Sequence, residues 1–218
     1  MHELQNHRIQ NSYMRQYIAL LNELNIKSGS RVLDIGSGLG FLKPLVTARG
    51  ATYIGIEPDR VSFEAACALY GHHGYLHGFF PEVAPDEYFD VVLALSCVDE
   101  VPDKAGFLSN MRNRIDPRHG IGYIAVRNRS FFVNRFKTEK RMSNRSERSR
   151  ISINDLSAAE WEALIAANGL IVREKGKFWR PWLTGISFIG IKNIAYRLIS
   201  IVLPRTQSYM LYYKIMAN

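Results

Sequence analysis

The stretch VLDIGSGLGFL, residues 32–42, decides the fold of this chain. Its apolar run ends in Asp34 and breaks at once into three glycines, Gly36, Gly38 and Gly40, each separated by one residue. An apolar run that enters a glycine turn is typical of a strand buried on both faces. Glycine accepts positive φ angles and lets another group approach the main chain closely. The spacing therefore predicts a buried strand with a ligand beside its carboxyl end.

Strand-like and helix-like segments alternate on both sides of this stretch. Strands are predicted at residues 31–35, 52–57, 75–79, 88–96, 120–126, 170–178 and 208–217, and helices at 12–24, 41–49, 60–70, 104–115 and 157–169. Ser157 and Glu160 form a capping box at the start of the last helix. Such alternation predicts one α/β domain over residues 1–218: a doubly wound, seven-stranded, mostly parallel sheet with an antiparallel last strand.

Two segments interrupt this pattern as insertions. Residues 127–152 are basic and contain three phenylalanines, and residues 179–207 are apolar and helix-like. The formal net charge of the chain is +8, and residues 112–150 account for it with twelve Lys or Arg against three acids. Both segments can be a lid over an anionic acceptor or an attachment to an anionic membrane surface. The plainer interpretations, a solvated loop and a core helix, stay open.

Cysteine content and the apolar runs limit the cellular setting. Only Cys67 and Cys97 occur, each inside a helix-like or strand-like segment, so neither a disulfide framework nor a four-ligand zinc site is expected. The N-terminus lacks the charged start and continuous apolar core of a signal peptide. Arg197 interrupts the best apolar run before it reaches spanning length. We therefore expect a cytoplasmic protein without a transmembrane helix, with peripheral membrane contact as an open possibility.

The glycine spacing separates three kinds of nucleotide site. In the dinucleotide pattern G-x-G-x-x-G the third glycine would stand at Phe41 or Lys43, and it does not. The phosphate-loop pattern fails because no Gly-Lys-Ser/Thr follows. A carboxylate, Glu57, ends the second predicted strand 23 positions after Asp34, where it can accept hydrogen bonds from both hydroxyls of a ribose. We expect the helix after the glycines to offer its N–H groups to an anion.

Asp34-x-Gly36-x-Gly38-x-Gly40 resembles the first motif of the Rossmann-like methyltransferases that use S-adenosylmethionine. The resemblance extends over roughly residues 10–178, because FDVVLALSCVDEVPD (residues 89–103) looks like the family's fourth strand and the loop after it. SAAEWEALIAANGLIV (residues 157–172) looks like its late helix and strand. The resemblance implies S-adenosylmethionine as cofactor and no obligatory metal.

The resemblance also implies where the cofactor binds. Asp34 and the backbone from Gly36 to Gly40 would hold its methionine part, Glu57 its ribose and Pro58 its adenine. The cofactor-binding residues expected in this way are Asp34, Gly36, Ser37, Gly38, Gly40, Glu57, Pro58, Phe79 and Ser96. Ser96, at the end of strand four, would face the methionine. An Asp is frequent after the family's third strand, but here that region reads HGFFPE, so Phe79 or Phe80 is expected on the adenine.

Methylation of a hydroxyl profits from a base near the acceptor. The candidates are Glu100 and Asp99, just beyond strand four, and His77, at the third strand. Many relatives carry Glu-His where this chain has Asp99-Glu100. For Glu100, capping of the helix at residue 104 is an open alternative; for His77, a structural role is.

The sequence is compatible with more than one class of methyl acceptor. The first expectation is O-methylation of a small molecule, sugar, glycan or lipid with anionic character. The second is an RNA methyltransferase, because the sequence pI is about 9.6 and arginines alternate with phenylalanines. No appended RNA-binding domain is recognisable, so nucleic acid is the less favoured partner. A third possibility is a binding protein that keeps the fold without catalysis. Oligomeric state is left open.

Overall fold

The computed structural model of the chain describes residues 18, 20–24, 26–128, 156–177 and 210–218. The predicted insertion at 179–207 and nearly all of that at 127–152 lie outside these residues, as does most of the helix predicted at 12–24. No helix among the described residues is long and apolar enough to cross a membrane.

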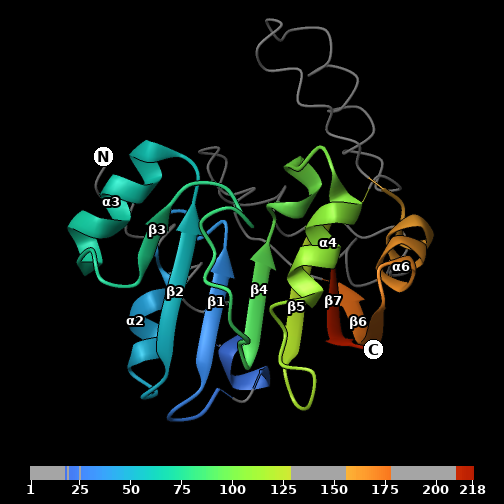
Figure 1. The fold of residues 1–218 in the computed structure, drawn as a ribbon, viewed down its shortest axis with the longest axis horizontal. Helices are drawn as coiled ribbons and strands as arrows, with labels where there is room; N and C mark the ends of the chain where they lie inside the picture. The colour runs from blue at the N-terminus through green and yellow to red at the C-terminus, as the bar shows by residue number, and fades with distance from the viewer. Residues whose placement is uncertain (1–17, 19, 25, 129–155, 178–209) are drawn as a thin grey trace, which may run out of the picture.

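The described strands form one seven-stranded sheet in the order β3-β2-β1-β4-β5-β7-β6 (Figure 1). They are β1 (Arg31–Ile35), β2 (Thr52–Glu57), β3 (Tyr75–His77), β4 (Val91–Leu95), β5 (Ile121–Arg127), β6 (Leu170–Lys177) and β7 (Met210–Ala217). Strands β3, β2, β1, β4 and β5 are parallel, while β7 pairs antiparallel with both β5 and β6. The predicted sheet, including its antiparallel last strand, is confirmed.

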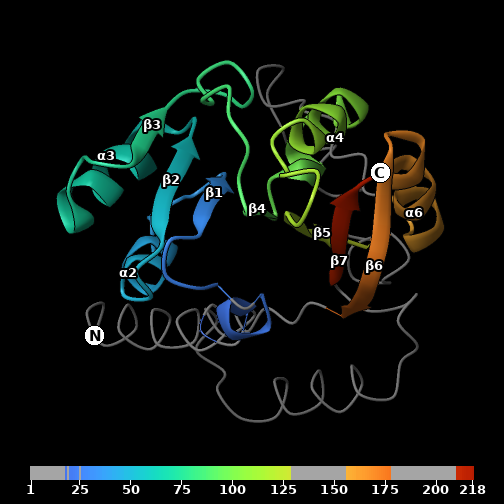
Figure 2. The same cartoon turned by 60° about the horizontal axis from the view of Figure 1, so that its bottom comes forward.

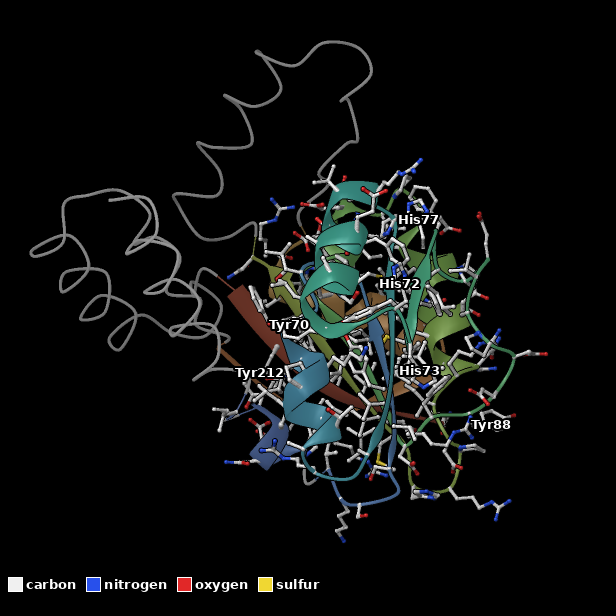
Figure 3. The ribbon with its side chains drawn as sticks, turned by 90° about the vertical axis from the view of Figure 1, so that its left-hand side faces the viewer. Tyr70, His72, His73, His77, Tyr88 and Tyr212 are labelled. Carbon is white, nitrogen blue, oxygen red and sulfur yellow. The ribbon has the colours of Figure 1, made fainter. Side chains whose placement is uncertain are left out.

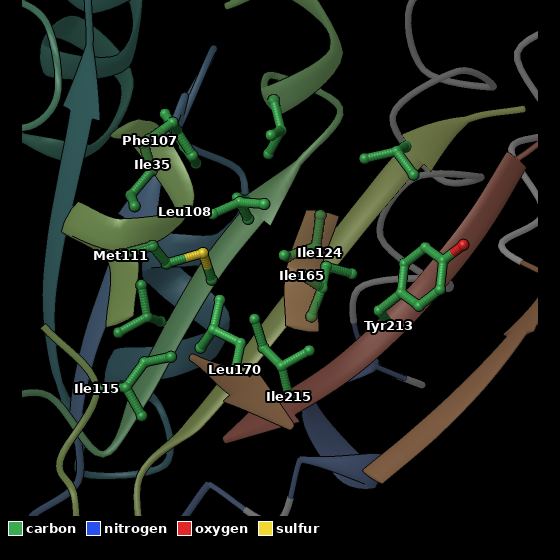
Figure 4. Close-up of a cluster of buried hydrophobic side chains, with 14 of the residues drawn as sticks. Ile35, Phe107, Leu108, Met111, Ile115, Ile124, Ile165, Leu170, Tyr213 and Ile215 are labelled. Carbon is green, nitrogen blue, oxygen red and sulfur yellow. The ribbon is translucent and has the colours of Figure 1, made fainter. Parts of the chain in front are cut away.

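Helices cover both faces of this sheet. They are α2 (Leu42–Thr47), α3 (Arg60–Tyr70), the short 3₁₀ helix η1 (Val98–Glu100), α4 (Lys104–Arg112) and α6 (Ala158–Ala167). Helices α2 and α3 lie toward β1 to β3, and α4 and α6 toward β5 to β7 (Figures 1 and 2). The buried apolar side chains accordingly form two clusters. One joins α2 and α3 to the sheet, and the other joins α4 and α6 to its opposite face (Figure 4).

Local sequence signals set the ends of the helices. Asp59 caps α3 by accepting from the Ser62 N–H, and the Ser157–Glu160 capping box of α6 is confirmed. Asp103 caps α4 by accepting from the Gly106 N–H. The alternative that Glu100 caps this helix is therefore wrong.

Two predicted strands are shorter than expected because their ends turn. Strand β4 stops at Leu95, since Ser96 has a φ of 68° that no strand residue adopts. Strand β3 stops at His77, before Gly78, whose φ is 146°. Both turns lie at carboxyl ends of parallel strands, where an α/β sheet binds its ligands.

Candidate functional site

The site is built where β1 and β4 lie side by side. From this pair the chain winds outward in both directions, to β2 and β3 on one side and to β5 on the other. The segments after β1 and β4 therefore diverge above the sheet, which makes this the topological switch point. The glycine turn, residues 36–40, follows β1, and Ser96 to Glu100 follow β4.

The three glycines of the turn have positive φ angles but different neighbours. A β-carbon on Gly36 would lie 2.7 Å from Cβ of Cys97, and one on Gly40 would lie 2.1 Å from the Tyr75 hydroxyl oxygen. A β-carbon on Gly38, with a φ of 55°, would have no atom within 4 Å. The space beside Gly36 and Gly40 is thus filled by the protein's own side chains, and the turn is open to a ligand at Gly38.

The main-chain N–H groups of the turn are mostly engaged within the protein. Those of Gly36 and Ser37 donate to the Ile56 carbonyl at 2.8 and 3.0 Å, and that of Gly40 donates to the Ser37 carbonyl. In α2 the Lys43 N–H donates to the Gly40 carbonyl. The Lys43 N–H is therefore not available to an anion, and for the other N–H groups at the start of α2 the expectation stays a prediction.

Glu57 is fixed against the turn from the neighbouring strand. One of its carboxylate oxygens accepts from the Gly38 N–H at 2.7 Å, and the other accepts from the Asp59 N–H at 2.9 Å. Glu57 as a whole is 8% exposed. Each oxygen keeps a second lone pair. The carboxylate is thus held in one orientation beside Gly38, with capacity for two further donors such as the hydroxyls of a ribose.

Asp34 lies beneath the turn and is almost fully buried. The Tyr53 hydroxyl donates to its Oδ2 at 2.7 Å. Burial raises the pKa of Asp34 to about 7; the hydrogen bond from Tyr53 opposes this rise, and the charge of Glu57 adds to it. A carboxyl group at this depth gains from a cationic partner, such as the amino group of an amino acid.

Two buried serine hydroxyls lie at the switch point, at the carboxyl ends of β1 and β4. Among the described residues the Ser96 Oγ makes no hydrogen bond, and the Ser37 Oγ has only the Tyr53 hydroxyl beside it. Ser96 moreover holds the strained positive φ already noted. Buried polar atoms are normally satisfied, so unsatisfied ones at the carboxyl ends of β1 and β4 indicate a polar ligand there.

The acids after β4 are arranged around one arginine. Arg127, at the end of β5, forms an ion pair with Asp99, which is 1% exposed. Its guanidinium also lies 3.6 Å from Glu100, whose side chain is 63% exposed. The sequence named Glu100 and, after it, Asp99 as base candidates, and the structure separates them. Asp99 is tied into a buried pair, whereas Glu100 remains accessible.

His77 does not join these acids. It ends β3, next to Glu57 of β2, and its ring lies 5.1 Å from that of Phe63. Figure 3 shows His72, His73 and His77 spread along the β3 side of the molecule. Strands β2 and β1 separate β3 from β4, a distance of about 14 Å at the usual strand spacing. His77 therefore lies with the predicted adenine-binding residues, of which Pro58 is exposed and Phe79 is 64% exposed.

Three residues that position the site carry no recognisable signal of that role at their own positions in the sequence. Tyr53 and Tyr75 lie inside predicted strands, where an aromatic residue indicates only core packing. Arg127 was counted as the start of the basic insertion. The signal that could have found Tyr53 is Gly55, two residues on along the same face of β2, which leaves room for its ring.

The residues present fit a ligand with an amino-acid end and a ribose. Asp34, the open backbone at Gly38 and the two serine hydroxyls would hold the first part, and Glu57 would hold the second. The chain also matches the model of a family described as methyltransferase domain, over residues 6–175. The protein belongs to this methyltransferase family. The family resemblance and the cofactor expected from it, S-adenosylmethionine, are thereby confirmed; the role of each single residue stays a prediction.

Curated relatives agree with this family. The methyltransferase is 34% identical, over 128 residues, to the ubiquinone biosynthesis O-methyltransferase of Rhodopseudomonas palustris strain TIE-1. It is 31% identical over 128 residues to the enzyme of the same name from Bradyrhizobium sp. strain ORS 278. Each match covers 56% of this chain and 50% of the relative, so the chain spans about half the length of these relatives.

Solved structures share the fold. A chain of the complex between the Haloferax volcanii Trm112 methyltransferase activator and a methyltransferase superposes with a TM-score of 0.68 at 19% identity, covering 98% of this chain and 95% of that one. The plantazolicin methyltransferase BpumL, in complex with a triazolic desmethylPZN analog and SAH, superposes with a TM-score of 0.60 at 17% identity. That match covers 96% of this chain and 85% of that one.

Proposed function

We propose that this methyltransferase transfers the methyl group of S-adenosylmethionine to a hydroxyl oxygen of a small organic acceptor with anionic character. The observation that carries the proposal is the 34% identity to a ubiquinone biosynthesis O-methyltransferase over 128 residues, together with the family match over residues 6–175, which include the switch point. The relatives' acceptor is not carried over, because the match spans half of their length.

The bound cofactor supplies an electrophilic methyl group on a sulfonium. The protein has to align the acceptor with that methyl group and keep water away, since the displacement is a single step. In this proposal Asp34 and the backbone at Gly38 hold the amino-acid end of the cofactor, and Glu57 holds its ribose. The Oγ atoms of Ser37 and Ser96 complete the polar contacts between them.

Glu100 is the proposed general base. A hydroxyl acceptor loses a proton when it is methylated, and a carboxylate within hydrogen-bond reach accepts it. Glu100 stands after β4 with an accessible side chain, and Arg127 lies 3.6 Å away to orient it. Asp99 is assigned a supporting role instead, because its Oδ2 is bound by Arg127 inside the protein. His77 is assigned to the cofactor's nucleoside end.

The base assignment is tested by Glu100→Gln. The variant keeps the shape of the side chain but accepts no proton, so kcat should fall about 100-fold or more while the affinity for S-adenosylhomocysteine stays unchanged. Glu64→Gln, on the exposed face of α3, is the matched control. Full turnover by Glu100→Gln would refute the assignment.

The acceptor class is tested by isotope transfer from S-adenosylmethionine. We would offer hydroxylated aromatic acids, sugar phosphates, nucleotide-linked sugars, anionic lipids and bulk RNA in parallel, and locate the methyl group in the product by mass spectrometry and NMR. Methyl ethers on a small anionic acceptor support the proposal. Methylation of RNA alone, with binding that weakens steeply with salt, would replace it by the second expectation.

A further inference from the structure

Two buried tyrosines hold the segment that runs from Asp34 to the end of the glycine turn. Tyr53 of β2 and Tyr75 of β3 are 5% and 6% exposed. The Tyr53 hydroxyl donates to Oδ2 of Asp34 at 2.7 Å, and the Tyr75 hydroxyl donates to the Gly40 carbonyl at 3.1 Å. Their rings meet edge to face with centroids 5.8 Å apart. Asp34, two residues before the turn, and Gly40, its last residue, are thus each bound by a tyrosine, and the two rings support each other.

Gly55 makes this arrangement possible. It lies between the two tyrosines, two residues after Tyr53 on β2 and opposite Tyr75 on β3. A β-carbon there would lie 2.8 Å from the Tyr53 hydroxyl oxygen and 2.9 Å from Cβ of Ser37. The Tyr53 side chain therefore leans along its own strand, over a position without a side chain, to reach Asp34.

Lys43 joins the segments around Tyr75 and contacts the ring of this tyrosine. Its ammonium donates to the carbonyls of Tyr70, Gly71 and His73 at 2.8, 2.9 and 2.5 Å. The same ammonium lies 4.5 Å from the ring centroid of Tyr75. The start of α2, the end of α3 and the start of β3 are joined at this point, so Tyr75 has little freedom to move.

We propose that Tyr53 is a positioning residue for the cofactor: by binding Oδ2 of Asp34, it leaves the other carboxylate oxygen for the cofactor's amino group. Tyr75 fixes the far end of the same turn. The inference rests on the proposed placement of the amino-acid end of the cofactor beside Asp34. It assigns a role in binding to a side chain that does not itself touch the cofactor.

The surroundings of Asp34 give this role a measurable consequence. Among the described residues, the ionisable groups around it are Tyr53 and Glu57 from β2, Tyr75 from β3, Cys97 after β4, and Lys43 of α2 behind the Tyr75 ring. Burial raises the pKa of Asp34, Tyr53 lowers it and Glu57 raises it. Without the Tyr53 hydroxyl, the pKa of Asp34 would be higher still. A larger share of Asp34 would then be neutral near pH 7 and unable to pair with an ammonium group.

The experiment is Tyr53→Phe, with the affinity for S-adenosylhomocysteine measured by calorimetry from pH 6 to pH 9. We expect about tenfold weaker binding at pH 7, the usual effect of one hydrogen bond to a charged group. We also expect the pH at which affinity is half-maximal to move upward by about one unit. The ligand's own amino group titrates equally in every variant, so the shift between variants belongs to the protein.

Three variants serve as controls. Tyr75→Phe removes the contact with the Gly40 carbonyl and should weaken binding without moving the midpoint. Asp34→Asn should weaken binding and abolish the part of the pH dependence that Asp34 causes. Tyr88→Phe, at a residue that is 53% exposed, should bind as the unsubstituted protein does.

The outcomes separate this inference from the function on which it rests. Failure of the unsubstituted protein to bind the ligand would overturn both. Normal binding together with an unchanged affinity and midpoint in Tyr53→Phe would overturn the role of Tyr53 alone, and so would a loss of equal size at every pH. If Tyr53→Phe does not fold, 3-fluorotyrosine at this position keeps the hydroxyl and makes it a stronger donor. The midpoint must then move downward, and an unchanged or higher midpoint overturns the inference.

Discussion

At the scale of single residues, each glycine of the motif is needed at its position for its own physical reason. Gly36 and Gly40 are required by the protein's own packing, because Cys97 and Tyr75 occupy the places of their side chains. Gly38 has open space beside it and donates its N–H to Glu57. A motif read as one ligand-binding feature is therefore partly a packing feature.

Alanine substitutions should separate these reasons. Gly40→Ala should lower the free energy of unfolding by about 3 kcal/mol, because a positive φ and a contact with Tyr75 are both unfavourable for alanine. Gly38→Ala should cost about 1 kcal/mol, for the φ angle alone, and yet weaken binding of S-adenosylhomocysteine. Urea denaturation and calorimetry measure the two effects. Equal losses of stability in both variants would contradict the distinction.

Asp34 should make the protein less stable as the pH rises. Its pKa is about 7 in the folded protein against an ordinary value of 3.8, so between these values the folded state holds a proton that the unfolded state has lost. Stability therefore falls from about pH 4 to pH 7. Asp34→Asn removes this dependence and should be about 1–3 kcal/mol more stable than the parent at pH 8, with the difference vanishing near pH 4.

Urea denaturation at several pH values measures this effect. Asp86→Asn, whose side chain is exposed in the parent, is the control and should leave the pH profile unchanged. A parent and an Asp34→Asn variant with parallel profiles would show that Asp34 ionises normally.

At the scale of elements, the ion pair of Arg127 and Asp99 joins two segments beyond the carboxyl ends of β4 and β5. It ties η1, which follows β4, to the last residue of β5. The pair is 14% and 1% exposed, so little water screens it. Glu100 lies in the same 3₁₀ turn, 3.6 Å from the Arg127 guanidinium.

Arg127→Met should destabilise the protein by about 3 kcal/mol, because it leaves the buried Asp99 without its partner. Turnover should fall as well, because η1 is released. Arg60→Met removes an exposed pair with Glu64 on α3 and should cause no measurable change in stability. Thermal and urea denaturation measure both variants. A loss in Arg127→Met no larger than in Arg60→Met would contradict the structural role of the pair.

At the scale of the whole molecule, the fold could be predicted from the sequence, because its signals are local. Each of these signals lies within a few residues of sequence: the strand-like or helix-like spacing of apolar residues, the capping box at Ser157, and the end of the apolar run at Asp34. The support of the site could not be predicted, since Tyr53 meets Asp34 and Arg127 meets Asp99 only after strands distant in sequence become neighbours. The end of β4 could not be predicted either. Serine is common at the end of a strand, and only the positive φ angle of Ser96 shows that the chain has already turned there.

The place of β7 has a consequence for the order of assembly. This strand lies between β5 and β6, and β6 makes its strand pairing through β7. During synthesis β6 leaves the ribosome about forty residues before its partner, a count set by the chain from Leu170 to Met210. One border of the nascent sheet thus stays unpaired until residue 217 has emerged, and chaperones that shield exposed strand edges would have their longest opportunity there.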